Sequence, residues 1–118
     1  MMITQTTRDN AAILSLVGRL DFNARHDFQA AVEKAKATGV HLIVAHLKDV
    51  SFIDSAALGL LTVAYKNLEA AKIRLVVAEP QDYVRKIFSL ANLGNLIKVY
   101  ATVDDAVSSR TSFASFSK

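Results

Sequence analysis

Apolar and polar residues alternate at the start of the chain and give way to longer apolar runs further on. The segment MITQTTR, at 2–8, has the period of two that is typical of a half-buried strand. A second strand is predicted at 11–20, AAILSLVGRL, and the Asp9-Asn10 pair before it is typical of a turn. So short a connection predicts that the two strands pair antiparallel.

Helical spacing begins after Asn23, which we expect to cap the first helix. Gly39 is suited to end that helix. The next run, VHLIVAHL at 40–47, is apolar almost throughout, as expected of a strand covered on both faces. The apolar positions of that first helix are Ala24, Phe28, Ala31, Val32 and Ala35.

A second helix is predicted over about 56–70.

Strands and helices continue to alternate in the second half of the chain. IRLVVA at 73–78 predicts a strand, and Pro80 is expected in the first turn of a third helix. A short last strand, LIKVY, is predicted at 96–100, and a final helix from about Thr102. The buried face of the third helix is expected to comprise Val84, Ile87, Phe88 and Ala91.

The order of elements is therefore β-β-α-β-α-β-α-β-α, which predicts an α/β fold. We expect a small mixed sheet whose parallel strands are joined by right-handed crossovers, with most helices packed on one side. Residues 1–107 are expected to form one domain, and the serine-rich segment 108–118 a flexible tail.

Composition excludes several classes of protein. The 118 residues include no cysteine, so disulfides and thiolate metal sites are excluded. The net charge is +3 and the basic residues are spread out, which argues against nucleic-acid binding. The start of the chain lacks a signal-peptide pattern, and its longest apolar-rich run, 56–65, is about half a membrane span. We expect a cytoplasmic protein without a membrane segment.

No residue pattern of an enzyme is present. The chain has four glycines and no glycine-rich phosphate loop. His41 and His46 are expected on one strand, five residues apart, where they would face opposite sides and share no metal. Ser55, His46 and Asp54 do not match a catalytic triad, because the acid and the serine are adjacent and no nucleophile elbow surrounds them. We expect no catalysis, no cofactor and no metal.

An acid and a hydroxyl, Asp54 and Ser55, separate an apolar strand from an apolar helix. Either side chain could cap the helix by accepting hydrogen bonds from its first turn, which would be a purely structural role. Alternatively, Ser55 is a phosphorylation site on a docking surface, because small and apolar residues follow it and a phosphate would add charge there. Those residues are Ala56, Ala57, Leu58, Gly59 and Leu60.

The segment LIVAHLKDVSFIDSAALGLL, at 42–61, resembles the signature of STAS domains, specifically of bacterial anti-sigma-factor antagonists. In that family an apolar strand runs into an F-[IM]-D-S junction and a helix that starts with small residues. The earlier segment VGRLDFNARHDFQAAV, at 17–32, is similar to the family's G-x-L-D followed by a helix. The resemblance covers residues 3–107, and its most specific part is 51–61.

The resemblance implies a partner switch. The unphosphorylated antagonist would bind an anti-sigma factor that is also a serine kinase with a GHKL-type ATP site, and phosphorylation at Ser55 would release it. A PP2C-type phosphatase would reset the cycle. The antagonist itself catalyses nothing. The implied partner-binding residues are Asp21, Asp54, Ser55, Ala56, Leu58 and Gly59.

Two positions depart from the family pattern. Ala57 stands where the family usually has glycine, and His46 stands where Asp or Asn is common. His46 either packs in the fold or favours a phosphate nearby.

Three alternatives remain open. The domain could be a scaffold or lipid-transport complex subunit that binds its partner constitutively, with Ser55 as a helix cap. It could be a small-molecule sensor, although the core shows no polar cluster to line a cleft. Pairing with another copy, through the tail or the leading strand, is also open.

Overall fold

The computed structural model describes the backbone of residues 1–116 and the side chains of residues 1–109. Within residues 1–116, five strands, four α-helices and two short 3-10 turns follow one another. The strands are β1 (Met2–Arg8), β2 (Ala11–Leu20), β3 (Leu42–Ile53), β4 (Arg74–Ala78) and β5 (Val99–Tyr100). The helices are α1 (Arg25–Lys36), α2 (Ser55–Ala70), α3 (Asp82–Leu90) and α4 (Val103–Phe116), and the turns are η1 (Phe22–Ala24) and η2 (Leu93–Asn95).

The sheet has the strand order β1-β2-β3-β4-β5, so the predicted mixed sheet is confirmed. β1 pairs antiparallel with β2, and the remaining neighbours are parallel. The turn between β1 and β2 consists of Asp9 and Asn10, with φ of 51° and 64°. A two-residue hairpin loop of this type needs positive φ at both positions, which Asp and Asn tolerate better than most residues. The predicted turn is therefore confirmed.

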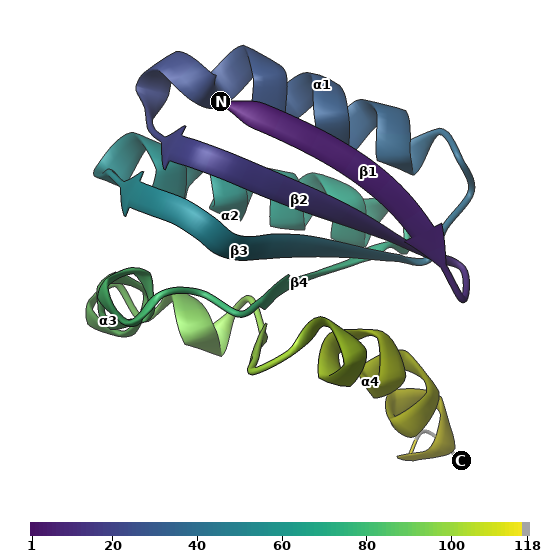
Figure 1. Cartoon of the computed structure of the whole chain (residues 1–118). Helices are drawn as coiled ribbons and strands as arrows, with labels where there is room; N and C mark the ends of the chain where they lie inside the picture. The colour runs from purple at the N-terminus through teal and green to yellow at the C-terminus, as the bar shows by residue number, and fades with distance from the viewer. Residues whose placement is uncertain (117–118) are drawn as a thin grey trace.

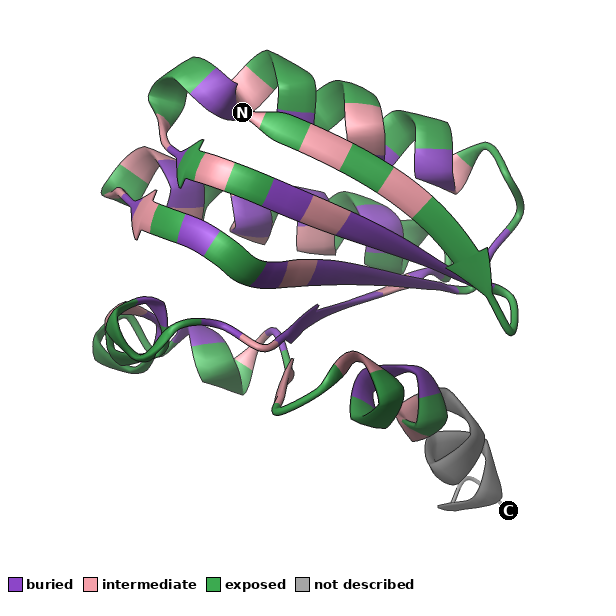
Figure 2. Cartoon of the chain, viewed as in Figure 1, coloured by how far each residue is buried: buried purple, intermediate pink, exposed green. Residues whose placement is uncertain are grey.

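The helices divide unequally between the two faces of the sheet (Figure 1). The larger core lies on the face covered by α1, α2 and α3, with Phe28, Leu61 and Phe88 among its buried side chains. A smaller core on the opposite face includes Ala106 and Val107 of α4. The first halves of β2 and β3 are buried on both sides, as Figure 2 shows, which confirms the prediction from the apolar run.

Two irregularities in β3 adjust which side chains face the larger core. The register against β2 shifts between Ser15 and Val17 and again between Gly18 and Arg19. After these shifts the buried residues Leu47, Val50 and Ile53 belong to the same core although their spacing is three rather than two. Such bulges redirect a strand locally.

Two sequence-based expectations about where helices begin are wrong. Asp21, not Asn23, is the capping residue after β2, and it caps the short turn η1 before α1 begins at Arg25. Pro80 lies outside α3, because the chain turns at Glu79 with a φ of 54° and the helix begins only after Gln81.

The bounds of α3, β5 and α4 differ from those expected from the sequence. Ala91 is exposed because it follows the last turn of α3 instead of lying on its inner face. β5 is limited to two residues, since Ile97 turns into the larger core before the strand begins. α4 crosses position 107, the expected boundary of the domain. The flexible tail stays a prediction, and its last residues, 117–118, lie outside the described part.

No helix within the described residues is both long enough and apolar enough to cross a membrane.

Candidate docking site at the start of α2

Asp54 is the cap of α2. Its backbone is extended, with φ −115° and ψ 179°, and its Oδ1 accepts the N–H of Ala57 at 2.8 Å. Oδ2 lies 3.4 Å from the backbone nitrogen of Phe22 and accepts its N–H as well. An acid at this position also complements the positive end of the helix dipole. The capping role considered for the junction therefore belongs to the acid.

Ser55 is the first residue of α2, and its side chain is exposed. Within the described residues its hydroxyl has no hydrogen-bond partner, and Ser55 is not the cap of α2. The N–H groups of Ser55 and Ala56 belong to the first turn, where no carbonyl of the same helix can accept them. The site thus offers a free hydroxyl beside free backbone donors.

The residues after Ser55 differ in exposure. Ala57 is fully buried, so its methyl group packs into the core. Ala56 is half-buried and Gly59 is exposed. Leu58 is also half-buried and packs against the larger core, so it presents only part of its side chain to the surface.

Asp21 lies next to this site because of the contact between Asp54 and Phe22. Asp21 Oδ1 accepts the N–H of Asn23 at 3.0 Å, and its Oδ2 lies 3.5 Å from Arg19 Nε. Asp21 directly precedes Phe22, whose N–H is bound by Asp54. The structure therefore brings together two acids that are far apart in the sequence, as the predicted docking surface requires.

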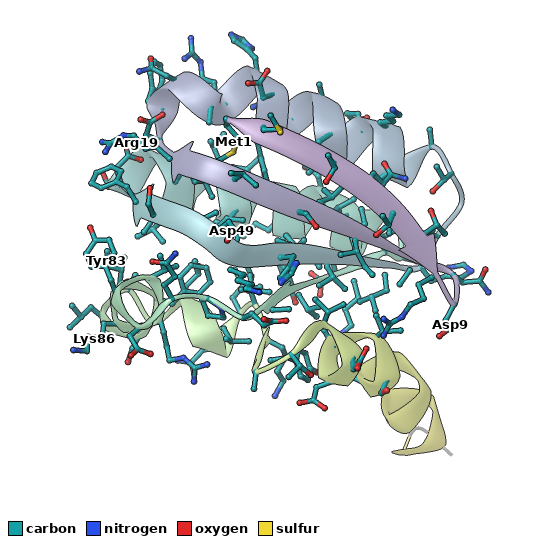
Figure 3. The ribbon with its side chains drawn as sticks, viewed as in Figure 1. Met1, Asp9, Arg19, Asp49, Tyr83 and Lys86 are labelled. Atoms are coloured by element: carbon teal, nitrogen blue, oxygen red, sulfur yellow. The ribbon has the colours of Figure 1, made fainter. Side chains whose placement is uncertain are left out.

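Sequence reasoning missed two aromatic residues at this end of the sheet. The Phe22 side chain is 55% exposed, and the guanidinium carbon of Arg25 lies 3.8 Å from its ring centroid. Arg19, labelled at the end of β2 in Figure 3, lies 4.0 Å from the ring centroid of Phe52. One sequence signal could have identified Phe22: it directly follows Asp21, at a position that no predicted core includes.

Of the two roles considered for His46, the structure supports packing within the fold. It lies midway along β3, and its Nε2 is 3.3 Å from Glu79 Oε2, with both side chains partly buried. The same Glu79 oxygen accepts the N–H of Val103 at the start of α4, at 3.4 Å. His46 thus belongs to the contacts that attach α4 to the sheet. His41 lies just before β3 and not on it.

No group of three metal-ligating side chains occurs among the described residues.

A small α/β domain thus carries, at the junction of β3 and α2, a helix cap, an exposed serine at the first helical position and a second acid nearby. The STAS domain family model matches residues 2–106. The chain belongs to the STAS domain family.

Similar proteins carry names that describe regulation by binding. An anti-sigma F factor antagonist of Lysinibacillus sphaericus is 32% identical over 94 residues, covering 79% of this chain and 77% of that protein. The solved structure of the anti-sigma factor antagonist SpoIIAA in its unphosphorylated form has a TM-score of 0.78 at 26% identity, and the match covers 94% of this chain and 97% of that one. These names describe antagonists of anti-sigma factors, in agreement with the expectation of a protein that binds and does not catalyse.

A second structure of that antagonist carries a phosphate. The Bacillus cell fate determinant SpoIIAA in its phosphorylated form has a TM-score of 0.68 at 27% identity, and the match covers 91% of this chain and 97% of that one. The fold seen here is therefore similar to a domain that has been solved both with and without phosphorylation.

Proposed function

We propose that this protein is an anti-sigma-factor antagonist whose binding to an anti-sigma factor is switched off by phosphorylation of Ser55. The observation that carries the proposal is the exposed Ser55 hydroxyl, which has no partner among the described residues, while the neighbouring Asp54 caps the helix. A hydroxyl without a structural role at this position is available for modification. The names of the similar proteins support the same role.

The unmodified surface has the character of a protein interface. We assign to it the residues predicted from the sequence and add Phe22, whose exposed ring stands beside the site. Val63, further along α2, is a second exposed apolar side chain, at 56%. Aromatic side chains and arginine are enriched in protein interfaces relative to the rest of the surface. The sequence-predicted members are Asp21, Asp54, Ser55, Ala56, Leu58 and Gly59.

Phosphorylation would change the charge of this surface without unfolding the domain. A phosphoserine adds about −1.5 to −2 charges. Asp54 and Asp21 already place negative charge there. The partner's surface is complementary to the unphosphorylated form, so the added phosphate would make its binding unfavourable. A loss of about 3 kcal/mol weakens a complex more than a hundredfold. The free N–H groups of the first turn favour a phosphate, so α2 should remain intact.

The partners follow from the family resemblance. We assign the kinase role to an anti-sigma factor with a GHKL-type ATP site, and the resetting step to a PP2C-type phosphatase. Because a kinase that uses ATP and a sigma factor both act in the cytoplasm, the proposal places this protein there.

Intact mass tests the modification. The protein is purified from its native cells under several growth conditions and weighed before and after phosphatase treatment. We expect a form heavier by one phosphate that maps to Ser55 and is absent from Ser55→Ala, while Ser89→Ala, at an exposed serine of α3, keeps it. A phosphate that maps elsewhere, or none under any condition, would contradict the switch.

Binding to the anti-sigma factor tests the consequence. We expect Ser55→Ala to retain the partner and Ser55→Asp to lose it by at least a hundredfold, with Ser89→Asp as the control. Equal affinity of the two Ser55 variants, in a complex that ATP does not dissociate, would instead favour a constitutive subunit of a scaffold or transport complex.

A further inference from the structure

We infer that a pocket at the amino ends of β3, β4 and β5 binds a small organic anion with an apolar part. The pocket has a volume of about 550 Å³, within the range of small-molecule sites. Its walls come from the last turns of α2, the entrances of these strands and the turn η2. The lining includes His41, Tyr65, Glu69, Lys72, Ile73, Arg74, Leu75, Asn95, Leu96 and Lys98.

The positive charge of the pocket follows from the topology. His41 immediately precedes β3, Arg74 begins β4 two residues after Lys72, and Lys98 immediately precedes β5. The amino ends of β3 and β4 are aligned, with Leu42 opposite Arg74, whereas β5 begins opposite Val77. The segment just before β5, which carries Lys98, therefore runs beside β4. Three permanently cationic side chains therefore line one pocket with a single carboxylate, that of Glu69. This excess of positive charge favours an anion.

Part of the wall is fixed before a ligand arrives. Arg74 donates from one guanidinium nitrogen to the hydroxyl of Tyr100 at 3.0 Å, and its backbone N–H donates to the carbonyl of His41 at 2.9 Å. Arg74 is only partly exposed, so its guanidinium has limited freedom. A guanidinium oriented in this way suits phosphate or carboxylate groups.

Other walls of the pocket are apolar. Ile73 and Leu75 are buried members of the larger core, and Leu96 packs against it. Tyr65 contributes an aromatic ring and donates its hydroxyl to Glu69 Oε2 at 3.2 Å. A ligand that fits both kinds of wall carries an anionic group on an apolar or aromatic body.

The dipole of α2 explains only some of the basic residues in the pocket. The carbonyl end of α2 is nearby, since the N–H groups of Lys72 and Ile73 bond to carbonyls of Glu69 and Leu68, and cations stabilise such an end. Lys98 comes from the entrance of β5, in a different part of the chain. A role confined to the helix dipole predicts no ligand binding at all.

The pocket is independent of the proposed phosphorylation site. Ser55 lies at the first residue of α2, beyond the carboxyl end of β3, whereas the pocket involves the last turns of α2 and the amino ends of the strands. The outcome of a ligand experiment therefore neither supports nor contradicts the switch at Ser55.

Phenyl phosphate is the probe, because it joins a dianionic group to an aromatic ring. The full chain, labelled with nitrogen-15, is titrated with phenyl phosphate, with phenol and with inorganic phosphate while amide resonances are recorded. We expect saturable shifts at residues 72–75 and 95–98 with phenyl phosphate, about tenfold weaker binding of inorganic phosphate, and no saturation with phenol.

Two variants locate the binding. Lys72→Gln and Lys98→Gln remove exposed cations and leave Arg74 and its contact with Tyr100 in place. We expect each to weaken binding of phenyl phosphate about tenfold, whereas Lys86→Gln, whose side chain projects from α3 (Figure 3), leaves it unchanged. The inference is overturned if phenyl phosphate gives no saturable shifts, if the shifts lie elsewhere, or if all three variants bind alike.

Discussion

The carboxylate of Asp54 accepts a hydrogen bond from the backbone N–H of Phe22, 32 positions earlier in the chain, over 3.4 Å. The same carboxylate caps α2 through Ala57. One side chain therefore joins the turn after β2 to the start of α2. These two segments carry Asp21 and Ser55, so Asp54 links the two parts of the proposed docking surface.

Removing this carboxylate should destabilise the domain. Asp54→Ala deletes a helix cap and a tertiary hydrogen bond, so we expect the free energy of unfolding to fall by about 1–2 kcal/mol. Asp54→Asn retains an acceptor oxygen and should lose less. Denaturation in urea measures both. Asp49→Ala, at an exposed position of β3, is the control, and an equal loss there would contradict the cap.

A negative charge at Ser55 should leave the fold intact. Ser55→Asp places a carboxylate in the first turn of α2, where the helix dipole favours it by about 0.3–1 kcal/mol. We expect a free energy of unfolding equal to or slightly above that of the unmodified protein, from urea denaturation, and unchanged amide resonances away from α2. A drop of several kcal/mol would mean that phosphorylation acts by unfolding the domain.

Phe22 should contribute to partner binding and little to stability. Its ring is more than half exposed, so Phe22→Ala should change the free energy of unfolding by less than about 0.5 kcal/mol. Affinity for the anti-sigma factor, measured by calorimetry, should fall at least tenfold. Tyr83→Ala is the matched control, because Tyr83 is 47% exposed on α3. Similar losses in both variants would remove Phe22 from the interface.

The attachment of α4 should rest on its apolar side chains and not on its surface ion pair. Arg8 and Asp104 form an exposed salt bridge, so Asp104→Ala should cost less than about 1 kcal/mol. Val107 is buried against the sheet, and Val107→Asp should cost at least about 2 kcal/mol because it buries a carboxylate without a partner. Thermal unfolding compares the two, and the reverse order would contradict this account.

Stability at alkaline pH should depend on Tyr65. Burial raises the pKa of Tyr65 above its ordinary value of 10.0, and the Glu69 carboxylate raises it further, while Arg74 acts in the opposite direction. The folded state then holds the phenolic proton more tightly than the unfolded state. This contribution to stability is full below pH 10.0 and is lost as the pH rises through the folded pKa.

Carbon-13 NMR of labelled tyrosines resolves this titration. We expect Tyr65 to ionise above pH 10.0 in the folded protein and Glu69→Gln to lower its pKa. Tyr83→Phe serves to assign the remaining signals and should leave the Tyr65 titration unchanged. An unaltered Tyr65 titration in Glu69→Gln would show that the carboxylate has no part in the shift.

Several expectations failed where local patterns compete with tertiary contacts. Asn23 is a good capping residue by type, but the chain places Asp21 at the cap because a short turn precedes α1. Pro80 suits a first helical turn, yet the chain first turns at Glu79. Phe22 was missed because an exposed aromatic has no periodic signal. The basic pocket was missed because its members come from separate strand entrances.

The sequence by itself determined the order of the elements, the mixed sheet and the strand-to-helix junction at Asp54-Ser55. It did so because hydrophobic periodicity and turn residues act over a few neighbouring positions. Only the tertiary structure decided that Asp54 and not Ser55 caps α2, that Asp21 lies near Asp54 through Phe22, and that Lys72, Arg74 and Lys98 line one basic pocket. These relations depend on strand pairing and register, which bring together residues that no local pattern connects.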